Sequence, residues 1–245
     1  MASTTPSLVL CDFAANTGEA RWSSFSPFVL EVERALRLAK LPFTHDKIAS
    51  RARIAQLNPT GQLPVLLVDS IPVPDSTRIL QKIEELAPGS LTQGLDARGI
   101  AEAWLWEEFA DTALYPHALA TRWADDRGWP VPRKAFFGGL PPVVRDVVSS
   151  LVRRKVKDGL VARDFTRAGL AACEARLFRV LDQLDARAPE LGFWLGDKPS
   201  VADLGLFAQL HSLRIPLTPW RAADIARRAR LSRWLDRVDA ATAPA

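Results

Sequence analysis

The chain has 245 residues, of which 48% are hydrophobic and 24% charged, and its formal net charge at pH 7 is +4. This hydrophobic content is enough to bury a core in one large domain or in two small ones. The basic runs are not interleaved with the aromatic side chains that a nucleic-acid platform needs. We therefore interpret them as solvated helix faces and expect no nucleic-acid partner.

Two cysteines, Cys11 and Cys173, lie far apart in apolar surroundings. Their spacing predicts neither a disulfide framework nor a set of metal ligands, so we expect no metal and a reducing compartment. The N-terminal stretch MASTTPSLVL lacks the pattern of a signal peptide, and no segment approaches the ~20 apolar residues of a membrane span. We therefore expect a cytoplasmic protein without a membrane span.

The N-terminal part of the chain begins with a strand pattern and a long connection. Residues 7–13 form a short apolar run that predicts a buried strand. The polar stretch 14–26 exceeds the about 2 to 6 residues usual for such connections, and loops of that length are often functional. From Pro27 the periodicity predicts a helix over 27–41, with Ser26 before it and proline in its first turn.

The residues that follow complete a compact α/β pattern. The sequence predicts four further elements there: a strand over 41–48, a short helix over 51–57, a β-hairpin formed by 64–68 and 71–74, and a helix over 75–86. Asp75 or Ser76 would cap the last helix. The N-terminal residues therefore give the order β-α-β, α, β-β-α.

The composition changes to Gly, Ser and Pro at residues 88–95, and no strand pattern follows. We place a linker there, between an N-terminal domain of residues 1–87 and a C-terminal domain of residues 96–245. Helical periodicity predicts five segments in the second domain: 99–119, 140–160, 167–187, 201–215 and 225–240. The expected fold class is an α/β domain followed by an all-α bundle.

A proline at the mouth of the third strand, Pro64, is the first candidate binding feature. Proline cannot donate to a ladder, so the strand lies at an edge or the chain bends there. Taken alone, a trans Leu63–Pro64 peptide is the default, because only about 5% of X-Pro bonds are cis. A cis peptide would leave the N–H and C=O of Leu63 unpaired, where an extended peptide could dock as an added strand.

Two predicted helix N-termini carry hydroxyl groups that could bind an anion. The free N–H groups and the dipole at Asp75 and Ser76 would hold a carboxylate. At Ser26 a thiolate would accept a hydrogen bond from the hydroxyl, and the positive helix end would lower its pKa. Ordinary capping explains each of these residues when it is considered alone.

Taken together in chain order, Ser26, the Leu63–Pro64 dipeptide and the helix start at Asp75 and Ser76 resemble the pattern of the glutathione transferase superfamily. The resemblance is carried by SPFVLEVERALRLAKLPF, LNPTGQLPVLLVDSIPVPDSTRI and WLGDKPSVADLGLF, and it spans nearly the whole chain. It implies a thioredoxin-like N-terminal domain, an all-helical C-terminal domain, glutathione as co-substrate, a small hydrophobic electrophile as second substrate, and a homodimer. Residues 128–157 also faintly resemble the C-terminal domains of metaxin-like and failed-axon-connections-like members.

The resemblance implies roles for the residues at the matching positions. The backbone of Leu63, before Pro64, would pair with the cysteinyl residue of glutathione, and Asp75 and Ser76 would hold its γ-glutamyl end. Gln62 stands where many relatives carry a basic residue for the glycine carboxylate. As a neutral donor, Gln62 would bind that carboxylate less strongly.

The hydroxyl that governs the thiol would be Ser26, with Ser24 and Ser23 as competitors. The single tyrosine, Tyr115, lies in the helical half, so a tyrosine-type site is excluded. No cysteine directly precedes Pro27, which disfavours thiol-disulfide exchange. A serine-type site is therefore expected.

The walls of the electrophile pocket would come from the first helical segment, with these candidates: Trp106, Phe109, Tyr115, His117 and Trp123. An aromatic stripe is also typical of a helix core, and His117 beside Pro116 is more typical of a helix end than of a general base. PSVAD resembles a buried capping box, with Ser200 as N-cap and Asp203 at N3, whose role is in folding.

The sequence thus favours an enzyme that activates the glutathione thiol for attack on a hydrophobic electrophile, with a role in detoxification. Two alternatives stay open. A non-catalytic binding protein on the same fold would be consistent with Gln62. A glutathione-dependent isomerase, dehalogenase or ether-cleaving enzyme would use the same thiolate on another substrate.

Overall fold

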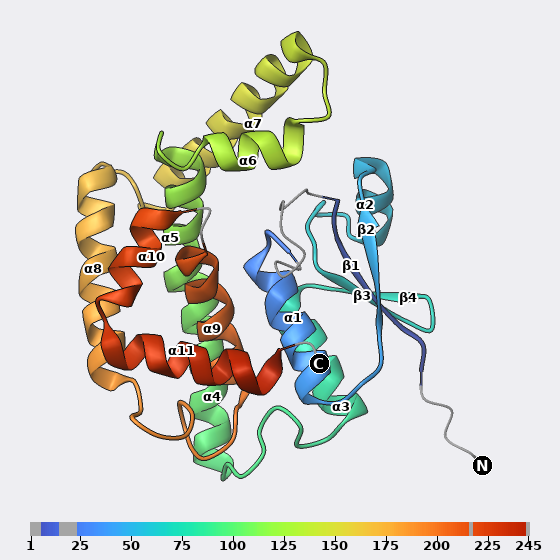
Figure 1. Cartoon of the computed structure of the whole chain (residues 1–245). Helices are drawn as coiled ribbons and strands as arrows, with labels where there is room; N and C mark the ends of the chain where they lie inside the picture. The colour runs from blue at the N-terminus through green and yellow to red at the C-terminus, as the bar shows by residue number, and fades with distance from the viewer. Residues whose placement is uncertain (1–5, 15–23, 216–217, 244–245) are drawn as a thin grey trace. The chain divides into compact units, whose positions relative to one another are not determined.

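The computed structural model describes residues 6–14, 24–215 and 218–243 (Figure 1). Contacts divide the chain into two compact units. Unit 1 comprises residues 1–107, 192–208 and 237–245, and unit 2 comprises residues 108–191 and 209–236. None of the described helices combines the length and the hydropathy that crossing a membrane requires.

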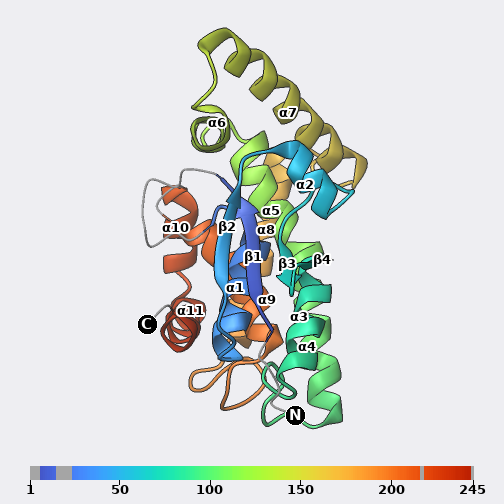
Figure 2. The same ribbon diagram turned by 90° about the vertical axis from the view of Figure 1, so that its right-hand side faces the viewer.

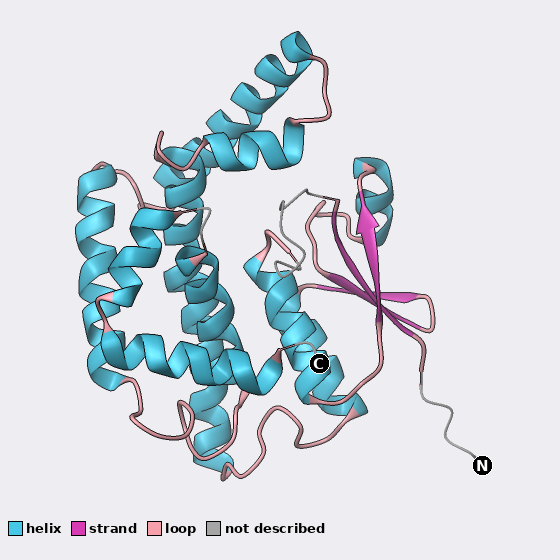
Figure 3. Ribbon diagram, in the orientation of Figure 1, coloured by secondary structure: helices cyan, strands magenta, loops and turns pink. Residues whose placement is uncertain are grey.

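Unit 1 contains a four-stranded sheet in the order β2-β1-β3-β4 (Figure 3). The strands are β1 (Leu8–Phe13), β2 (Thr44–Ile48), β3 (Val65–Val68) and β4 (Ile71–Pro74). β1 pairs in parallel with β2 and antiparallel with β3, and β3 pairs antiparallel with β4. Asp69 and Ser70 join β3 to β4 with φ values of 49° and 70°, as a two-residue hairpin loop with both residues left-handed requires.

Three helices cover this sheet: α1 (Pro27–Leu38), α2 (Arg51–Leu57) and α3 (Ser76–Leu86). α1 and α3 pack against each other and against strands of the sheet, while α2 contacts β2 (Figures 1 and 2). Strand alternation places Cys11 on the face that packs against Ile54 of α2, and Leu10 and Asp12 on the opposite face. The predicted order β-α-β, α, β-β-α is confirmed.

The first helix is shorter than predicted. It ends at Leu38 rather than at residue 41, because Lys40 has a φ of 55°. Lys40 N–H donates to the Arg37 carbonyl and Leu41 N–H to the Leu36 carbonyl, each at 3.0 Å. These two bonds form a Schellman motif in which lysine occupies the left-handed position that glycine usually takes.

The predicted linker coincides with a turn-rich segment between α3 and α4 (Ala97–Phe109). Glu84 holds this segment by accepting hydrogen bonds from Gly89 N at 3.0 Å, Leu91 N at 2.9 Å and Thr92 Oγ1 at 2.7 Å. Unit 1 also includes the first eleven residues of α4, up to Glu107. A domain boundary at residues 88–95 stays a prediction.

The start of α9 (Val201–Arg214) belongs to unit 1 and carries the predicted capping residues. The buried Asp203 carboxylate accepts hydrogen bonds from Ser200 N at 2.9 Å, Ser200 Oγ at 3.0 Å and Trp194 N at 2.8 Å. Val201 N–H donates to the Leu91 carbonyl at 2.8 Å. Ser200 and Asp203 therefore anchor the helix start in the core, as predicted.

The last turns of α11 (Ala229–Thr242) also belong to unit 1 and pair with α1. Arg34 is nearly buried, and its Nη2 lies 2.7 Å from Asp239 Oδ1. Its Nη1 donates to Thr242 Oγ1 at 3.2 Å, and its guanidinium lies 5.2 Å from the ring centroid of Phe207. The first helix of the chain is thereby tied to the last.

Unit 2 opens with a helical continuation of α4 that contains two π-helical turns: η1 (Ala110–Leu114), α5 (Tyr115–Leu119) and η2 (Ala120–Ala124). Tyr115 N–H donates to the Ala110 carbonyl, the i to i−5 bond of a π turn. Pro116, which follows at once, lacks an N–H and disturbs regular α-helical bonding. The predicted helix over 99–119 is therefore part of a longer helical stretch from Ala97 to Ala124.

The remaining helices of unit 2 are α6 (Pro130–Phe137), α7 (Pro142–Ala162), α8 (Leu170–Arg187) and α10 (Pro219–Ala226). α6 was not predicted, because its prolines resemble a turn, yet Pro130 occupies the first helical position where proline is tolerated. The predicted helix over 225–240 is wrong as one element, since α10 ends at Ala226 and α11 begins at Ala229.

Candidate functional site

Ser26 caps the N-terminus of α1. Its Oγ accepts a hydrogen bond from Val29 N at 3.4 Å, and its carbonyl accepts one from Leu30 N at 3.1 Å. The hydroxyl proton of Ser26 is donated to none of the residues that the structure describes. Capping and donation to an external anion are compatible in this side chain, because the first uses the oxygen as acceptor and the second uses the proton.

The hydroxyl of Ser24 is engaged on both sides. It donates to Asp12 Oδ1 at 2.9 Å and accepts the backbone N–H of Ser26 at 3.0 Å. Ser23, the other predicted competitor, lies outside the described residues. Of Ser24 and Ser26, only Ser26 has a hydroxyl proton without an acceptor in the described part of the chain.

Asp12 is a buried carboxylate beside Ser24 that was not predicted from the sequence. It is 1% exposed, and besides Ser24 it accepts hydrogen bonds from Phe13 N at 2.7 Å and Lys47 Nζ at 2.5 Å. Burial raises the pKa of this carboxyl group, opposed by its hydrogen bonds and by the charge of Lys47. An acidic residue on the inward face of a buried strand, in phase with Leu10, is the signal that could have identified it.

The Leu63–Pro64 peptide is cis, as the resemblance implies and against the default for an isolated X-Pro bond. Leu63 is buried and is separated from the start of β3 at Val65 by Pro64. Its backbone N–H and C=O take part in no hydrogen bond with the described residues. Gln62 is exposed, and its backbone carbonyl accepts a hydrogen bond from Asn58 Nδ2 at 3.0 Å.

Asp75 and Ser76 form the start of α3. Asp75 is the N-cap, with its Oδ1 accepting from Arg78 N at 3.2 Å, and Ser76 is a nearly buried first residue. Asp75 has a φ of 79°, a conformation that non-glycine residues rarely adopt and that concentrates at functional sites. The helix start therefore combines free N–H groups, a buried hydroxyl and a strained cap.

These features fit the glutathione roles that the resemblance implies. A peptide backbone at Leu63 would find a donor and an acceptor that have no partner among the described residues, and a carboxylate at Ser76 would find a helix N-terminus. A thiolate at Ser26 would find a hydroxyl proton. All three groups lie in unit 1.

The residues predicted to line an electrophile pocket are divided between the two units. Trp106 belongs to unit 1 and contacts Trp194 edge-on, with ring centroids 5.2 Å apart. The other four belong to unit 2, where Trp123 stacks on Phe136 at 6.0 Å. Burial raises the pKa of Tyr115, so its phenol stays protonated. A pocket wall built from these residues and from Phe109 and His117 stays a prediction.

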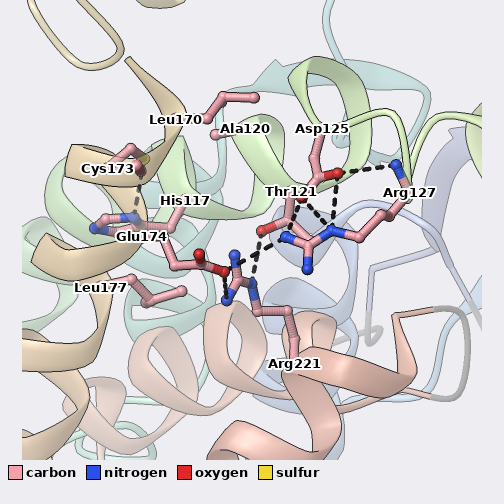
Figure 4. A pocket seen from close by; sticks show the side chains of 11 residues that line it. His117, Ala120, Thr121, Asp125, Arg127, Leu170, Cys173, Glu174, Leu177 and Arg221 are labelled. Atoms are coloured by element: carbon pink, nitrogen blue, oxygen red, sulfur yellow. Dashed lines mark hydrogen bonds and ion pairs between the residues drawn. The ribbon is translucent and has the colours of Figure 1, made fainter. Parts of the chain in front are cut away.

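Unit 2 contains a cavity of about 240 Å³ between α5, η2, α8 and α10 (Figure 4). One wall is apolar, and the other carries charges that are already paired. Arg221 Nη1 lies 2.8 Å from Glu174 Oε1 and 3.0 Å from Asp224 Oδ2, and Arg127 pairs with Asp125 at 2.6 Å. A molecule in this cavity would therefore contact apolar surface and charges that are already paired with each other.

His117 is the one predicted pocket residue that lines this cavity, and it is 1% exposed. Its Nδ1 lies 3.6 Å from Cys173 Sγ, and its ring makes an edge contact with Phe165 at 4.6 Å between centroids. Burial, and then the charges of Arg176 and Arg221, lower the pKa of His117 to about 3. A neutral imidazole in this position is not a general base for solvent-exposed chemistry.

Both cysteines are free and buried. Burial raises the pKa of Cys11 and of Cys173 to about 11. Neither thiol is therefore ionised near neutral pH, and the expectation that this chain does not catalyse thiol-disulfide exchange stays a prediction.

Two family models match the chain. One is described as the glutathione S-transferase N-terminal domain and matches residues 27–128, and the other as the glutathione S-transferase C-terminal domain and matches residues 167–237. Together they cover most of the chain. The hairpin of α6 and α7 lies between the two matched ranges.

Among curated proteins, glutathione transferase GST 23 from Zea mays is 37% identical over 106 residues. That match covers 39% of this chain and 47% of the maize protein, so it spans about half of the relative's length.

Among solved structures, glutathione S-transferase III in its apo form aligns with a TM-score of 0.62 and 20% identity, covering 96% of this chain and 92% of the other. The beta-etherase LigF from Sphingobium sp. strain SYK-6 aligns with a TM-score of 0.65 and 19% identity, covering 96% and 95%. At such identities the likeness establishes the two-part fold alone.

Proposed function

This chain belongs to the glutathione transferase superfamily, and from that premise we propose that it activates the thiol of glutathione through Ser26 for attack on a small hydrophobic electrophile. The observation that carries the proposal is the geometry of Ser26. Its oxygen accepts the Val29 N–H while its proton has no acceptor among the described residues, at the positive end of a 12-residue helix.

The energy asked of this arrangement is modest. Lowering a thiol pKa by ~2 units corresponds to roughly 2.7 kcal/mol. A hydrogen bond to a charged group contributes about 1.5 to 3 kcal/mol, and a helix N-terminus adds about 0.3 to 1 kcal/mol. Ser26 and the start of α1 can therefore supply the whole shift.

The remaining contacts orient glutathione rather than activate it. In this proposal Leu63 pairs with the cysteinyl backbone, Asp75 and Ser76 hold the γ-glutamyl carboxylate, and Gln62 reaches the glycine end. Gln62 carries no charge, so binding of the glycine carboxylate is the weak point and the Michaelis constant for glutathione is expected to be high. We also propose a cytoplasmic homodimer with a role in detoxification.

The test compares two substitutions at Ser26. Ser26→Ala removes both the cap and the proton donor, whereas Ser26→Asp keeps a capping acceptor and places a negative charge against the thiolate. We expect both to raise the pKa of bound glutathione by about 1 to 2 units and to lower conjugation at neutral pH by about 10- to 100-fold. The ultraviolet absorbance of the bound thiolate, titrated with pH, measures the shift directly.

Ser50→Ala is the matched control. Ser50 caps α2 through its Oγ, which accepts from Arg53 N at 3.3 Å, so this variant removes a comparable cap elsewhere in unit 1. It should leave the thiol pKa unchanged. An unchanged thiol pKa in Ser26→Asp, or no saturable binding of glutathione at all, would overturn the proposal and favour a non-catalytic binding protein.

The reaction type is a separate question. Isomerisation, dehalogenation and ether cleavage all begin with the same thiolate. The likeness to a beta-etherase concerns the fold alone and does not select among these reactions. Product analysis with one substrate of each class, alongside a standard conjugation electrophile, distinguishes these reactions.

A further inference from the structure

Asp12 lies at the end of β1 on the face of the sheet that packs against α1 and α3. A carboxylate that is 1% exposed is costly to keep there unless each oxygen is hydrogen-bonded. Both oxygens of Asp12 are satisfied, Oδ1 by Phe13 N and Ser24 Oγ and Oδ2 by Lys47 Nζ. The Asp12 carboxylate is therefore a fully hydrogen-bonded group in the buried face of the sheet.

The register of the sheet explains how the charge is balanced. Asp12 and Lys47 are direct partners across the parallel pair β1 and β2, so their side chains leave the sheet on the same face. The side chain of Lys47 is 42% exposed, and its ammonium can stay hydrated while it neutralises the buried carboxylate. Because Lys47 binds Oδ2, Oδ1 of Asp12 remains to accept the hydrogen bonds from Phe13 N and Ser24 Oγ.

From Asp12 a line of hydrogen bonds leads to the cap of α1. Ser24 Oγ donates to Asp12 Oδ1 at 2.9 Å and accepts from Ser26 N at 3.0 Å. Because the carboxylate fixes the direction of the Ser24 hydroxyl proton, the lone pairs of Ser24 are turned toward the Ser26 amide. The backbone of Ser26 is thereby held in the extended conformation, φ −86° and ψ 120°, from which its side chain caps the helix.

We propose that Asp12 is a positioning residue that acts through Ser24 to hold Ser26 in place as the thiol ligand. The inference rests on the proposed function of Ser26 and adds to it the group that sets the geometry of that serine. It also assigns Ser24 a definite role, that of the link between the carboxylate and the Ser26 backbone. Neither Asp12 nor Ser24 touches the thiolate in this scheme.

A positioning role has a distinctive kinetic result. Loosening Ser26 weakens the stabilisation of the thiolate but leaves intact the groups that bind the rest of glutathione. The bound thiol pKa and kcat should therefore change, while the Michaelis constant for glutathione stays within about twofold. A loss of folded protein alone would lower the apparent kcat without moving the thiol pKa.

Three variants test the line of hydrogen bonds. Ser24→Ala removes the link, Ser24→Thr keeps a hydroxyl at the same position, and Asp12→Asn keeps the shape of the side chain but removes its charge. Ser50→Ala serves again as the control for a lost serine contact in unit 1. If the buried change at Asp12 prevents folding, the two half-buried Ser24 variants still decide the question.

The first readout needs no glutathione. Hydrogen exchange of the Ser26 amide, followed by NMR in the ligand-free protein, should become about 2- to 10-fold faster in Ser24→Ala and in Asp12→Asn, the range expected for one net hydrogen bond. Ser24→Thr and Ser50→Ala should exchange as the unmodified protein does. Unchanged exchange in Ser24→Ala would overturn the proposal.

The second readout is the pH titration of bound glutathione thiolate. We expect a pKa about 0.5 to 1 unit higher in Ser24→Ala, a smaller shift than in Ser26→Ala, and recovery in Ser24→Thr. A shift in Ser26→Ala with none in Ser24→Ala would overturn the role of Asp12 and leave the proposed function standing. A shift in Ser24→Ala with none in Ser26→Ala would make Ser24 the thiol ligand and overturn both.

Discussion

We expect His117 to make the protein less stable in acid. Its imidazole is 1% exposed, and burial together with the charges of Arg176 and Arg221 lowers its pKa to about 3. Its Nε2 has no hydrogen-bond partner among the described residues, and its Nδ1 meets only the Cys173 thiol. The folded state therefore keeps His117 neutral at a pH where the unfolded chain, with a pKa of about 6.5, takes up a proton.

The sign of the effect follows from this difference. Because the unfolded state binds more protons as the pH falls below about 6.5, the stability that neutral His117 contributes is fully present above that pH and is lost on acidification toward pH 3. At about pH 5 the unfolded pKa lies ~1.5 units above the pH. At 1.36 kcal/mol per unit, the loss between pH 8 and pH 5 is about 2 kcal/mol.

The assay is urea unfolding of the unmodified protein and of His117→Gln at several pH values between about 8 and 5. The variant is expected to start from a lower stability, because it disturbs a packed site, but to lose about 2 kcal/mol less on acidification. His211→Gln, at a half-buried histidine beside Arg214, is the control and should leave most of the pH dependence in place. Parallel pH curves for the unmodified protein and His117→Gln would show that His117 does not cause the loss of stability in acid.

Two further predictions concern the clamp on α1 and the buried thiols. Asp239→Ala removes the charge that pairs with nearly buried Arg34 and should lower the free energy of unfolding by about 2 kcal/mol, reduced from the value for a fully buried pair because Asp239 is 37% exposed. Asp236→Ala, which breaks a pair with Arg214 at a 70% exposed carboxylate on the same helix, should cost less than about 1 kcal/mol, and equal costs would contradict this account. Cys11 and Cys173 should resist alkylation near neutral pH until the protein unfolds, and rapid modification of either in the native protein, measured by mass spectrometry, would show that its thiol is not buried as described.

The order of elements in the N-terminal part could be read from the sequence because it depends on local patterns. Alternating apolar residues in residues 7–13, the cap and proline before α1, and the turn between β3 and β4 each reflect contacts within a few residues. The end of α1 was placed too late because a lysine at a left-handed position, Lys40, gives no sequence signal. α6 was missed because its prolines resemble those of a turn.

The parts of the candidate site that were missed depend on contacts between distant residues. Asp12 and Lys47 are 35 residues apart in sequence, and only the parallel register of β1 and β2 makes them neighbours. The choice between Ser24 and Ser26 likewise depends on which hydroxyl already donates a hydrogen bond within the protein. The cis Leu63–Pro64 peptide could be expected from family resemblance but not from the dipeptide itself.

The tie between Arg34 and α11 has a consequence for synthesis of the chain. Helix α1 leaves the ribosome early, but the carboxylate and hydroxyl that accept its guanidinium are supplied by residues translated about 200 positions later. Until then, the helix that carries Ser26 must hold a positive charge without its final partners. Unit 1 is therefore completed late, when the nascent chain has emerged through α11, and an abortive product that ends before this helix would leave Arg34 without these partners.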